Sequence, residues 1–190
     1  MSESKKIQEN QRNYSKFFIG LLACFLFRLI PFRPPNIEPI LATQMPFTRI
    51  YGPVAGFLFG FLSIFLFDLV TSGIGVWTWI TSLAYGVVAL GATYFFSNRE
   101  GTALNYGLFA ILATLFFDAV TGLTIGPIFE HQPFMVALTG QIPFTLLHLL
   151  GNVSFSILLS PSIYQWAGRT SKPKRKRFIL SEQKLSIKYS

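Results

Sequence analysis

Charged side chains are scarce in this chain of 190 residues, at 13% of the composition, and Asp, Glu, Lys and Arg are missing altogether from Gln132 to Gly168. A bilayer needs only about 20 apolar residues to be crossed. Hydrophobic residues make up 51% of the chain, with 21 Phe, which excludes an ordinary soluble domain. The composition predicts an integral membrane protein without a separate soluble domain.

Cysteine and histidine are also rare, with one Cys and two His in the sequence. A single Cys excludes an intrachain disulfide framework and a thiolate metal cluster. His131 and His148 lie too far apart for a recognisable zinc motif. There is no phosphate-binding loop of the Walker type, so ATP hydrolysis would have to come from a partner. We therefore expect no catalytic residues, no metal site and no cofactor.

Charge-free runs divide the chain into six predicted spans. They lie at residues 17–31, 37–49, 52–71, 76–96, 103–121 and 135–160. The second run is short and contains Glu38, Gln44 and Pro46, so a half-helix or a re-entrant segment packed inside protein is also open. The predicted fold is an all-α integral membrane protein, a six-helix transmembrane bundle.

The N-terminus contains a motif that is typical of processed proteins. Leu21-Leu22-Ala23-Cys24 after a basic start resembles a bacterial lipoprotein cleavage site. Its apolar region, from Phe17 to Ala23, is at the short end of the usual range, and the apolar run continues past Cys24. These features favour an uncleaved first helix.

Basic residues gather at the two ends of the chain. Of the sixteen Lys and Arg, four precede the first span and eight follow the last. An even number of spans and the positive-inside rule then place both termini in the cytoplasm. We expect a basic N-terminus at 1–16, a membrane domain at 17–160 and a basic tail at 161–190. The Lys172 to Arg177 cluster is expected to contact anionic membrane lipids or a partner, and nucleic-acid binding is not expected.

The last span contains a polar stripe of Gln141, Thr145, His148 and Asn152. Their spacing of i, i+4, i+7 and i+11 puts them on one helix face. Polar groups in hydrocarbon need partners, so this face is predicted to point at other helices or at an enclosed cavity. Interhelical hydrogen bonding explains any one of them, whereas four together favour a binding cavity.

A short motif occurs twice, fifty residues apart. Phe67-Asp68-Leu69-Val70-Thr71 is echoed by Phe117-Asp118-Ala119-Val120-Thr121, and each copy ends a predicted span at the outer face. Asp68 and Asp118 either complete the helix ends or line the mouth of a site. Two further stripes, at Thr114, Asp118 and Thr121 and at Thr78, Ser82 and Tyr85, are predicted to converge with the stripe of the last span.

Glycines repeat at Gly52, Gly56 and Gly60, a spacing that lets another helix approach closely. Packing within the chain is the favoured explanation, ahead of a subunit interface. Gly20 and Cys24 form a weaker pair of the same kind on the first span.

Several segments together resemble a known family. They are Arg28-Leu29-Ile30-Pro31, Pro35-Asn36-Ile37-Glu38-Pro39, Tyr51 to Gly60 leading to Asp68, Ala84-Tyr85-Gly86, and Gln141-Ile142-Pro143-Phe144-Thr145 with His148 and Asn152. Over about residues 15–165 the chain resembles the substrate-binding S components of energy-coupling factor (ECF) transporters. The resemblance implies six helices around a vitamin-sized cavity, capped by the loop after the first helix. It also implies a multi-pass protein of a prokaryotic cytoplasmic (inner) membrane.

The resemblance implies partners and a mechanism of binding without chemistry. An S component docks on a transmembrane T component that is driven by two ATP-binding-cassette ATPases. Gly20 and Cys24 occupy the place where the family contacts the T component, although the usual pair is two alanines. The substrate would be a vitamin-like molecule, a vitamin or cofactor precursor. The predicted substrate-binding residues are Asn36, Glu38, Asp68, Trp77, Trp79, Tyr85, Asp118, Gln141, Thr145, His148 and Asn152. Gln141 and Thr145 are placed nearer the outer surface than Asn152, which is as well explained by helix packing.

Two other classes stay open at this point. Gly56-Phe57-Leu58-Phe59-Gly60 with a following Asp also resembles the rod-shape morphogenesis membrane protein MreD, a scaffold without a small-molecule ligand. That resemblance leaves the Pro35 to Pro39 segment and the polar stripe unexplained. A membrane enzyme using Asp68, Asp118 and His148 as acid-base groups is the third class.

Overall fold

The computed structural model describes residues 3–34 and 36–168, and this part of the chain is all-helical. For residues 3–13 only the backbone is described. The elements are α1 (Glu3–Arg28), α2 (Ile40–Tyr51), α3 (Pro53–Val70), α4 (Val76–Phe95), α5 (Ala103–Gly122), the π-helical turn η1 (Ile125–Phe129) and α6 (Phe134–Gly168). The Lys172 to Arg177 cluster lies outside the described residues.

Four of the described segments are long and apolar enough to cross a membrane. They are Pro53–Val70, Val76–Phe95, Ala103–Phe129 and Phe134–Gly168. The bounds of α3, α4 and α5 agree with the predicted spans to within one residue at each end. Helix α6 continues past the predicted end at residue 160 as far as Gly168, so the first part of the predicted tail is helical.

Helix α2 is short and central. Its 12 residues correspond to about 18 Å, which is less than the hydrocarbon thickness of about 30 Å. Every residue from Ile40 to Thr48 is buried, and the helix contacts each of the other five α-helices. The second predicted span is therefore a buried core helix that is too short to cross a bilayer. A helix that other helices cover on all sides is expected to be buried in this way.

The glycine ladder allows α2 to pack tightly on α3. Gly52 turns the chain between the two helices with a φ of 97°, a conformation that favours glycine. A Cβ atom on Gly60 would overlap Gln44 Nε2 and lie 2.9 Å from the Tyr85 carbonyl oxygen. Gln44 Nε2 uses this space to donate to the carbonyls of Gly56 at 3.1 Å and Tyr85 at 2.7 Å. The ladder thus serves packing within the chain, as favoured from the sequence.

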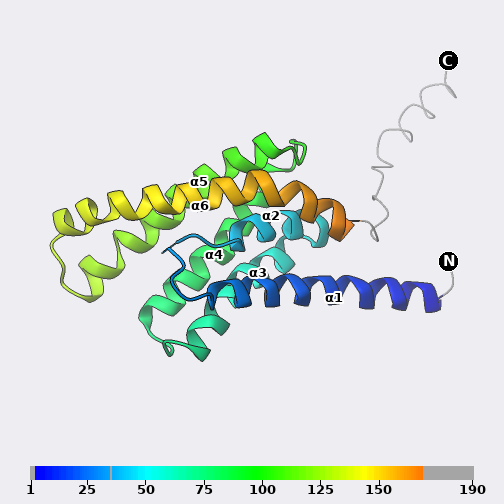
Figure 1. Ribbon diagram of the computed structural model, residues 1–190, viewed down its shortest axis with the longest axis horizontal. Coiled ribbons are helices and arrows are strands. Elements are labelled where there is room, and N and C mark those ends of the chain that lie inside the picture. The colour runs from blue at the N-terminus through cyan, green and yellow to red at the C-terminus, as the bar shows by residue number, and fades with distance from the viewer. Residues whose placement is uncertain (1–2, 35, 169–190) are drawn as a thin grey trace, which may run out of the picture.

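The helices alternate between the two ends of the bundle (Figure 1). The beginning of α1 and the end of α6 lie at one end, and the loops after α1, α3 and α5 lie at the other. Lys16 links α1 to the end of α6, because its Nζ donates to the carbonyls of Trp166 at 2.7 Å and Ala167 at 3.1 Å. A lysine suits this position, since it meets unpaired carbonyls at a helix C-terminus.

Candidate functional site

Glu38 is the centre of a charged cluster in the loop between α1 and α2. Its Oε2 lies 3.0 Å from Arg28 Nε and 3.9 Å from Arg33 Nη1. Its Oε1 accepts a hydrogen bond of 3.2 Å from the Tyr85 hydroxyl. One carboxylate therefore ties the end of α1 and the following loop to helix α4.

The end of α1 is fixed to α3, and the following loop is fixed to α6. Arg28 Nη1 donates to the Ser63 carbonyl at 3.0 Å, and its guanidinium lies 3.8 Å from the centre of the Phe67 ring. Asn36 has a φ of 63°, a left-handed conformation in which Asn is enriched. A Cβ on Gly151 would come within 3.0 Å of the Asn36 carbonyl oxygen, so the loop rests directly on α6. The described residues of the loop therefore pack closely over this part of the bundle.

Below the loop, α5 and α6 are joined by two buried hydrogen bonds. His148 Nδ1 lies 2.7 Å from Asp118 Oδ1, and Asn152 Nδ2 donates to Thr114 Oγ1 at 2.8 Å. The tautomer of the His148 imidazole sets which of the two groups donates in the first bond. Each helix supplies residues at i and i+4, and the antiparallel arrangement matches them in pairs. The predicted convergence of the α5 and α6 stripes is confirmed for His148 and Asn152.

Tyr85 connects the loop cluster to the α5–α6 pairs. Its hydroxyl bonds Glu38, and its ring centre lies 4.5 Å from that of Phe117. It packs around a space too small to admit a water molecule, together with Leu41, Val88, Ala113, Thr114, Phe117, His148 and Asn152. Ligand pockets usually occupy about 300–1,000 Å³. A vitamin-sized molecule therefore needs these side chains or the loop above them to move.

Two members of the polar stripe were missed in the sequence. Ser156 and Ser160 continue it from Asn152 at the same i+4 interval, and both are fully buried. Ser160 Oγ donates to the Ala42 carbonyl at 2.8 Å and so holds α6 against α2. Extending the i+4 interval along the sequence beyond Asn152 would have identified both serines. The Arg28 and Arg33 partners of Glu38 were also missed, although intramembrane charges usually pair.

The remaining polar predictions lie apart from these contacts. Asp68 Oδ2 accepts from Thr78 Oγ1 at 2.8 Å, joining the end of α3 to the start of α4. Gln141 Nε2 donates to Thr145 Oγ1 at 3.2 Å, and both residues are half-buried. The structure thus supplies a helix-end partner for Asp68 and places Gln141 and Thr145 nearer the start of α6.

Trp77 and Trp79 are 45% and 49% exposed on α4. The Trp79 ring packs against Phe61 and Phe65 of α3, with ring centres 6.4 and 5.3 Å away. Within the described chain neither Trp has a hydrogen bond or ring contact with another predicted site residue. Their exposure fits the aromatic belt of a membrane interface.

Gly20 and Cys24 face α2 and not the outside of the bundle. A Cβ on Gly20 would lie 2.7 Å from the Phe47 ring, and Cys24 is 2% exposed with its sulfur 3.6 Å from Thr43 Oγ1. The pair predicted to dock on a partner is therefore covered by the chain's own second helix in this structure.

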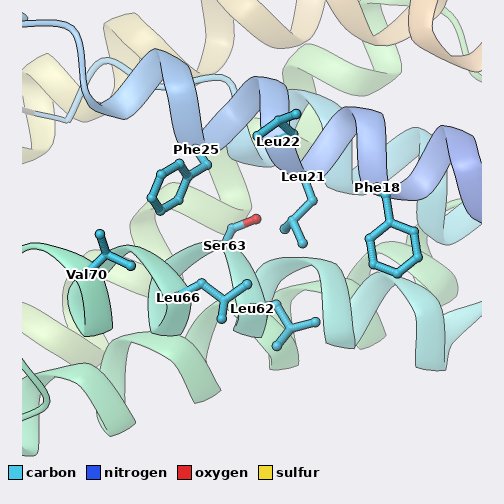
Figure 2. A pocket seen from close by; sticks show the side chains of 8 residues that line it. All are labelled: Phe18, Leu21, Leu22, Phe25, Leu62, Ser63, Leu66 and Val70. Carbon is cyan, nitrogen blue, oxygen red and sulfur yellow. The ribbon is translucent and has the colours of Figure 1, made fainter.

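A separate groove runs between α1 and α3 (Figure 2). Its volume is about 440 Å³, and Figure 2 shows apolar side chains from both helices pointing into it. The lining residues are Phe18, Leu21, Leu22, Phe25, Leu62, Ser63, Leu66 and Val70. Ser63, its one polar lining residue, already donates to the Phe59 carbonyl at 2.7 Å. The groove lacks the polar anchors that a vitamin site needs.

Metal ligation finds no support among the described residues, where no three His, Cys, Asp or Glu side chains gather. The polar groups below the loop are suited to hydrogen bonding with a bound molecule. The candidate site is therefore the region under the loop, bounded by Glu38 and Tyr85 above and by the α5–α6 pairs below.

Comparison with known proteins gives one match over most of the chain. A family model described as "ECF-type riboflavin transporter, S component" matches residues 18–165. A UPF0397 protein of Aliivibrio salmonicida (strain LFI1238) is 38% identical over 66 residues, which is 34% of each chain. A UPF0397 protein of Aliivibrio fischeri (strain MJ11) is 36% identical over 66 residues, again 34% of each.

The aligned region thus spans about a third of the length of these curated relatives. No solved structure matches the chain. The family match confirms the resemblance to S components and favours a transport subunit over the scaffold and the membrane enzyme. This chain belongs to the family described as the S component of ECF-type riboflavin transporters, and its apolar helices fit a multi-pass membrane protein.

Proposed function

We propose that this protein captures a vitamin or cofactor precursor from outside the cell and delivers it to the cytoplasm together with a T component and two ATP-binding-cassette ATPases. The observation that carries the proposal is the family match over residues 18–165. The buried polar groups beneath the loop between α1 and α2 support it, because such groups seldom occur in a membrane without a role.

Riboflavin is the first candidate substrate, because the family is described by that vitamin. The proposed contacts are the predicted residues that gather under the loop: Asn36, Glu38, Tyr85, Asp118, His148 and Asn152. Gln141 and Thr145 are proposed at the entrance, and Asp68, Trp77 and Trp79 at its rim. In the described conformation the space between these side chains does not admit a water molecule, so the proposal requires that the loop lifts and the Tyr85 ring swings away to make room for the substrate.

The proposed orientation has both termini in the cytoplasm of a prokaryote and the loops after α1, α3 and α5 outside. The charge distribution supports it, since basic residues favour the cytoplasmic side. The common position of the start of α1 and the end of α6 is compatible with it (Figure 1). The basic ends would then contact anionic lipids of the inner leaflet.

Docking on the T component is proposed for helix α1. Gly20 and Cys24 set the close distance between α1 and α2. The same helix exposes large apolar side chains, including Phe18, Ile19, Leu22 and Leu26, each at least 55% exposed. These are the proposed contacts, and Gly20 and Cys24 support them from the opposite face of α1, where they pack on α2.

Uptake in a cell that depends on an external vitamin tests this function. A riboflavin-requiring bacterium without its own importer should grow on low riboflavin when it expresses this chain with a T component and two ATPases. It should not grow when the ATPases carry a Walker lysine substitution. Growth on none of a panel of vitamins, with the protein present in the membrane, would contradict the proposal.

A further inference from the structure

Arg49, in the last turn of α2, is a cation without an acidic partner in the described part of the chain. None of the ion pairs between described residues includes it. Glu100, in the loop after α4, is exposed and forms no ion pair with Arg49. Because a partly buried charge is normally paired, Arg49 is suited to an anion from outside the described residues.

Three aromatic rings hold the Arg49 guanidinium in place. Its Cζ lies 4.5 Å from the ring centre of Tyr164, 5.0 Å from that of Phe96 and 5.7 Å from that of Tyr106. We call these three rings the aromatic cage. A Cβ on Gly101 would overlap Arg49 Nη1, so the glycine leaves room for the guanidinium. Ring faces attract a cation, but they leave its N–H groups without acceptors.

The donor groups of Arg49 are only partly used. Nη1 donates to the Tyr106 hydroxyl at 3.0 Å, and the side chain has no other acceptor among the described residues. Arg49 is half-buried, so its remaining N–H groups reach the surface. A guanidinium presents its N–H groups in planar pairs that match the oxygens of a phosphate or a carboxylate.

The surroundings indicate a position at the surface of the membrane. Tyr94, in the last turn of α4, is 85% exposed, and Trp166, in the last turn of α6, is 38% exposed. Exposed Tyr and Trp side chains are typical of the headgroup level of a bilayer. The Trp166 ring and carbonyl also contact Lys16, a second cation at this end of the bundle. Phosphate is the anion found at that level.

Positive charge exceeds negative charge at this end of the bundle. Lys16, Arg49 and Arg99 lie here, and Glu100 is the one carboxylate among the side chains that the structure describes at this end. The sequence from 169 to 190 adds eight Lys or Arg and one Glu. This excess favours a lipid with net negative charge over a zwitterionic one.

We propose that Arg49 and the aromatic cage bind the phosphate of an anionic membrane lipid. The guanidinium donates to the phosphate oxygens, and the acyl chains follow the apolar outer faces of the neighbouring helices. The bound phosphate neutralises Arg49 and joins the end of α2 to the ends of α4 and α6 and to the start of α5. The loop between α1 and α2 lies at the other end of the bundle, so this site is separate from the proposed substrate site (Figure 1).

Native mass spectrometry of the delipidated, detergent-purified protein measures the binding. Phosphatidylglycerol is titrated and compared with phosphatidylcholine, which has a phosphate but no net charge. The first phosphatidylglycerol should bind more tightly, and Arg49→Gln should weaken it about tenfold or more, because charge-assisted hydrogen bonds are lost. Arg99→Gln is the matched control, since Arg99 is exposed and its Cζ lies 4.2 Å from one ring, that of Phe95. It should bind phosphatidylglycerol as the unaltered chain does.

Gly101→Ala tests the geometry while the charge is kept. Its methyl group would meet Arg49 Nη1 and, at 2.8 Å, the Tyr106 hydroxyl oxygen, which are both at the ends of side chains. The guanidinium should therefore turn aside, and phosphatidylglycerol should bind more weakly. This variant decides the question if Arg49→Gln does not fold. Unchanged binding in Gly101→Ala, or equal losses in Arg49→Gln and Arg99→Gln, would overturn the site.

Inorganic phosphate distinguishes the lipid from a soluble ligand with the same group. It should neither displace the first phosphatidylglycerol nor raise the unfolding midpoint. Displacement by inorganic phosphate would overturn the assignment to a lipid, and equal binding of the two lipids would overturn the preference for an anionic one. None of these measurements involves a vitamin, so their failure would leave the proposed transport function standing.

Discussion

At Glu38 a single carboxylate holds side chains from three parts of the chain. Its partners are Arg28 at the end of α1, Arg33 in the following loop and Tyr85 in the middle of α4. The side chains of Arg28 and Glu38 are 12% and 9% exposed. A charge at such a depth is stable only while its partner is present.

Glu38→Gln should therefore destabilise the protein by about 3 kcal/mol, because it leaves the buried Arg28 guanidinium without its counter-charge. Thermal unfolding in detergent measures the effect as a lowered midpoint. Glu130→Gln is the matched control, since Glu130 is exposed and has no ion pair among the described residues. Equal midpoints for the two variants would show that the Glu38 cluster does not stabilise the fold.

Residue roles in this region were only partly predictable from the sequence. The spacing of His148 and Asn152 placed them on an inward face, and they do meet the stripe of α5. No local pattern reveals that Glu38 pairs with Arg28 and Tyr85, because the pairs join residues 10 and 47 positions apart through the loop fold. Asp68 and Asp118 share a sequence motif yet have different partners, since their neighbours belong to different helices.

Among the elements, α2 depends most on close approach. It lies inside the bundle because Gly56 and Gly60 of α3 leave room for Thr48 and Gln44. The sequence predicted this packing from the glycine interval. The sequence did not show that α2 is a buried helix, because a short apolar segment between charged residues is compatible both with a membrane span and with a core helix.

Gly60→Ala should lower the unfolding midpoint by several degrees in detergent. Its new methyl group would meet the Tyr85 carbonyl oxygen at 2.9 Å, and backbone moves aside only at a cost. Gly140→Ala is the control, since its Cβ meets nothing within 4 Å and alanine favours a helix by about 1 kcal/mol. The account fails here if Gly60→Ala is as stable as Gly140→Ala.

For the whole molecule, the alternation of helix ends makes a prediction about topology. Ser72 follows α3 and Ser97 follows α4, at opposite ends of the bundle, and both are exposed. In a Cys24→Ala background, Ser72→Cys should react with a membrane-impermeant maleimide on intact cells. Ser97→Cys should react only after the cells are opened. The reverse pattern would invert the proposed orientation.

The overall architecture was predictable where long charge-free runs set the helices. Helices α3, α4 and α5 follow those runs closely, because the hydrocarbon layer of the membrane both excludes charged side chains and sets the length of a span. The C-terminal end of α6 was not predictable in this way. Its last turns contain polar residues and were therefore assigned to the tail. In the structure α6 continues to Gly168, and Lys16 of α1 donates hydrogen bonds to carbonyls of its last turn.

Mass spectrometry of small molecules released from the detergent-purified protein tests the central claim most directly. The account predicts a vitamin or cofactor precursor at close to one molecule per protein, and its loss from Asp118→Asn purified in the same way. Ser160→Ala should retain it. A protein that releases no such molecule, and whose unfolding midpoint is unchanged by a panel of vitamins, would contradict the claim that this chain binds a substrate.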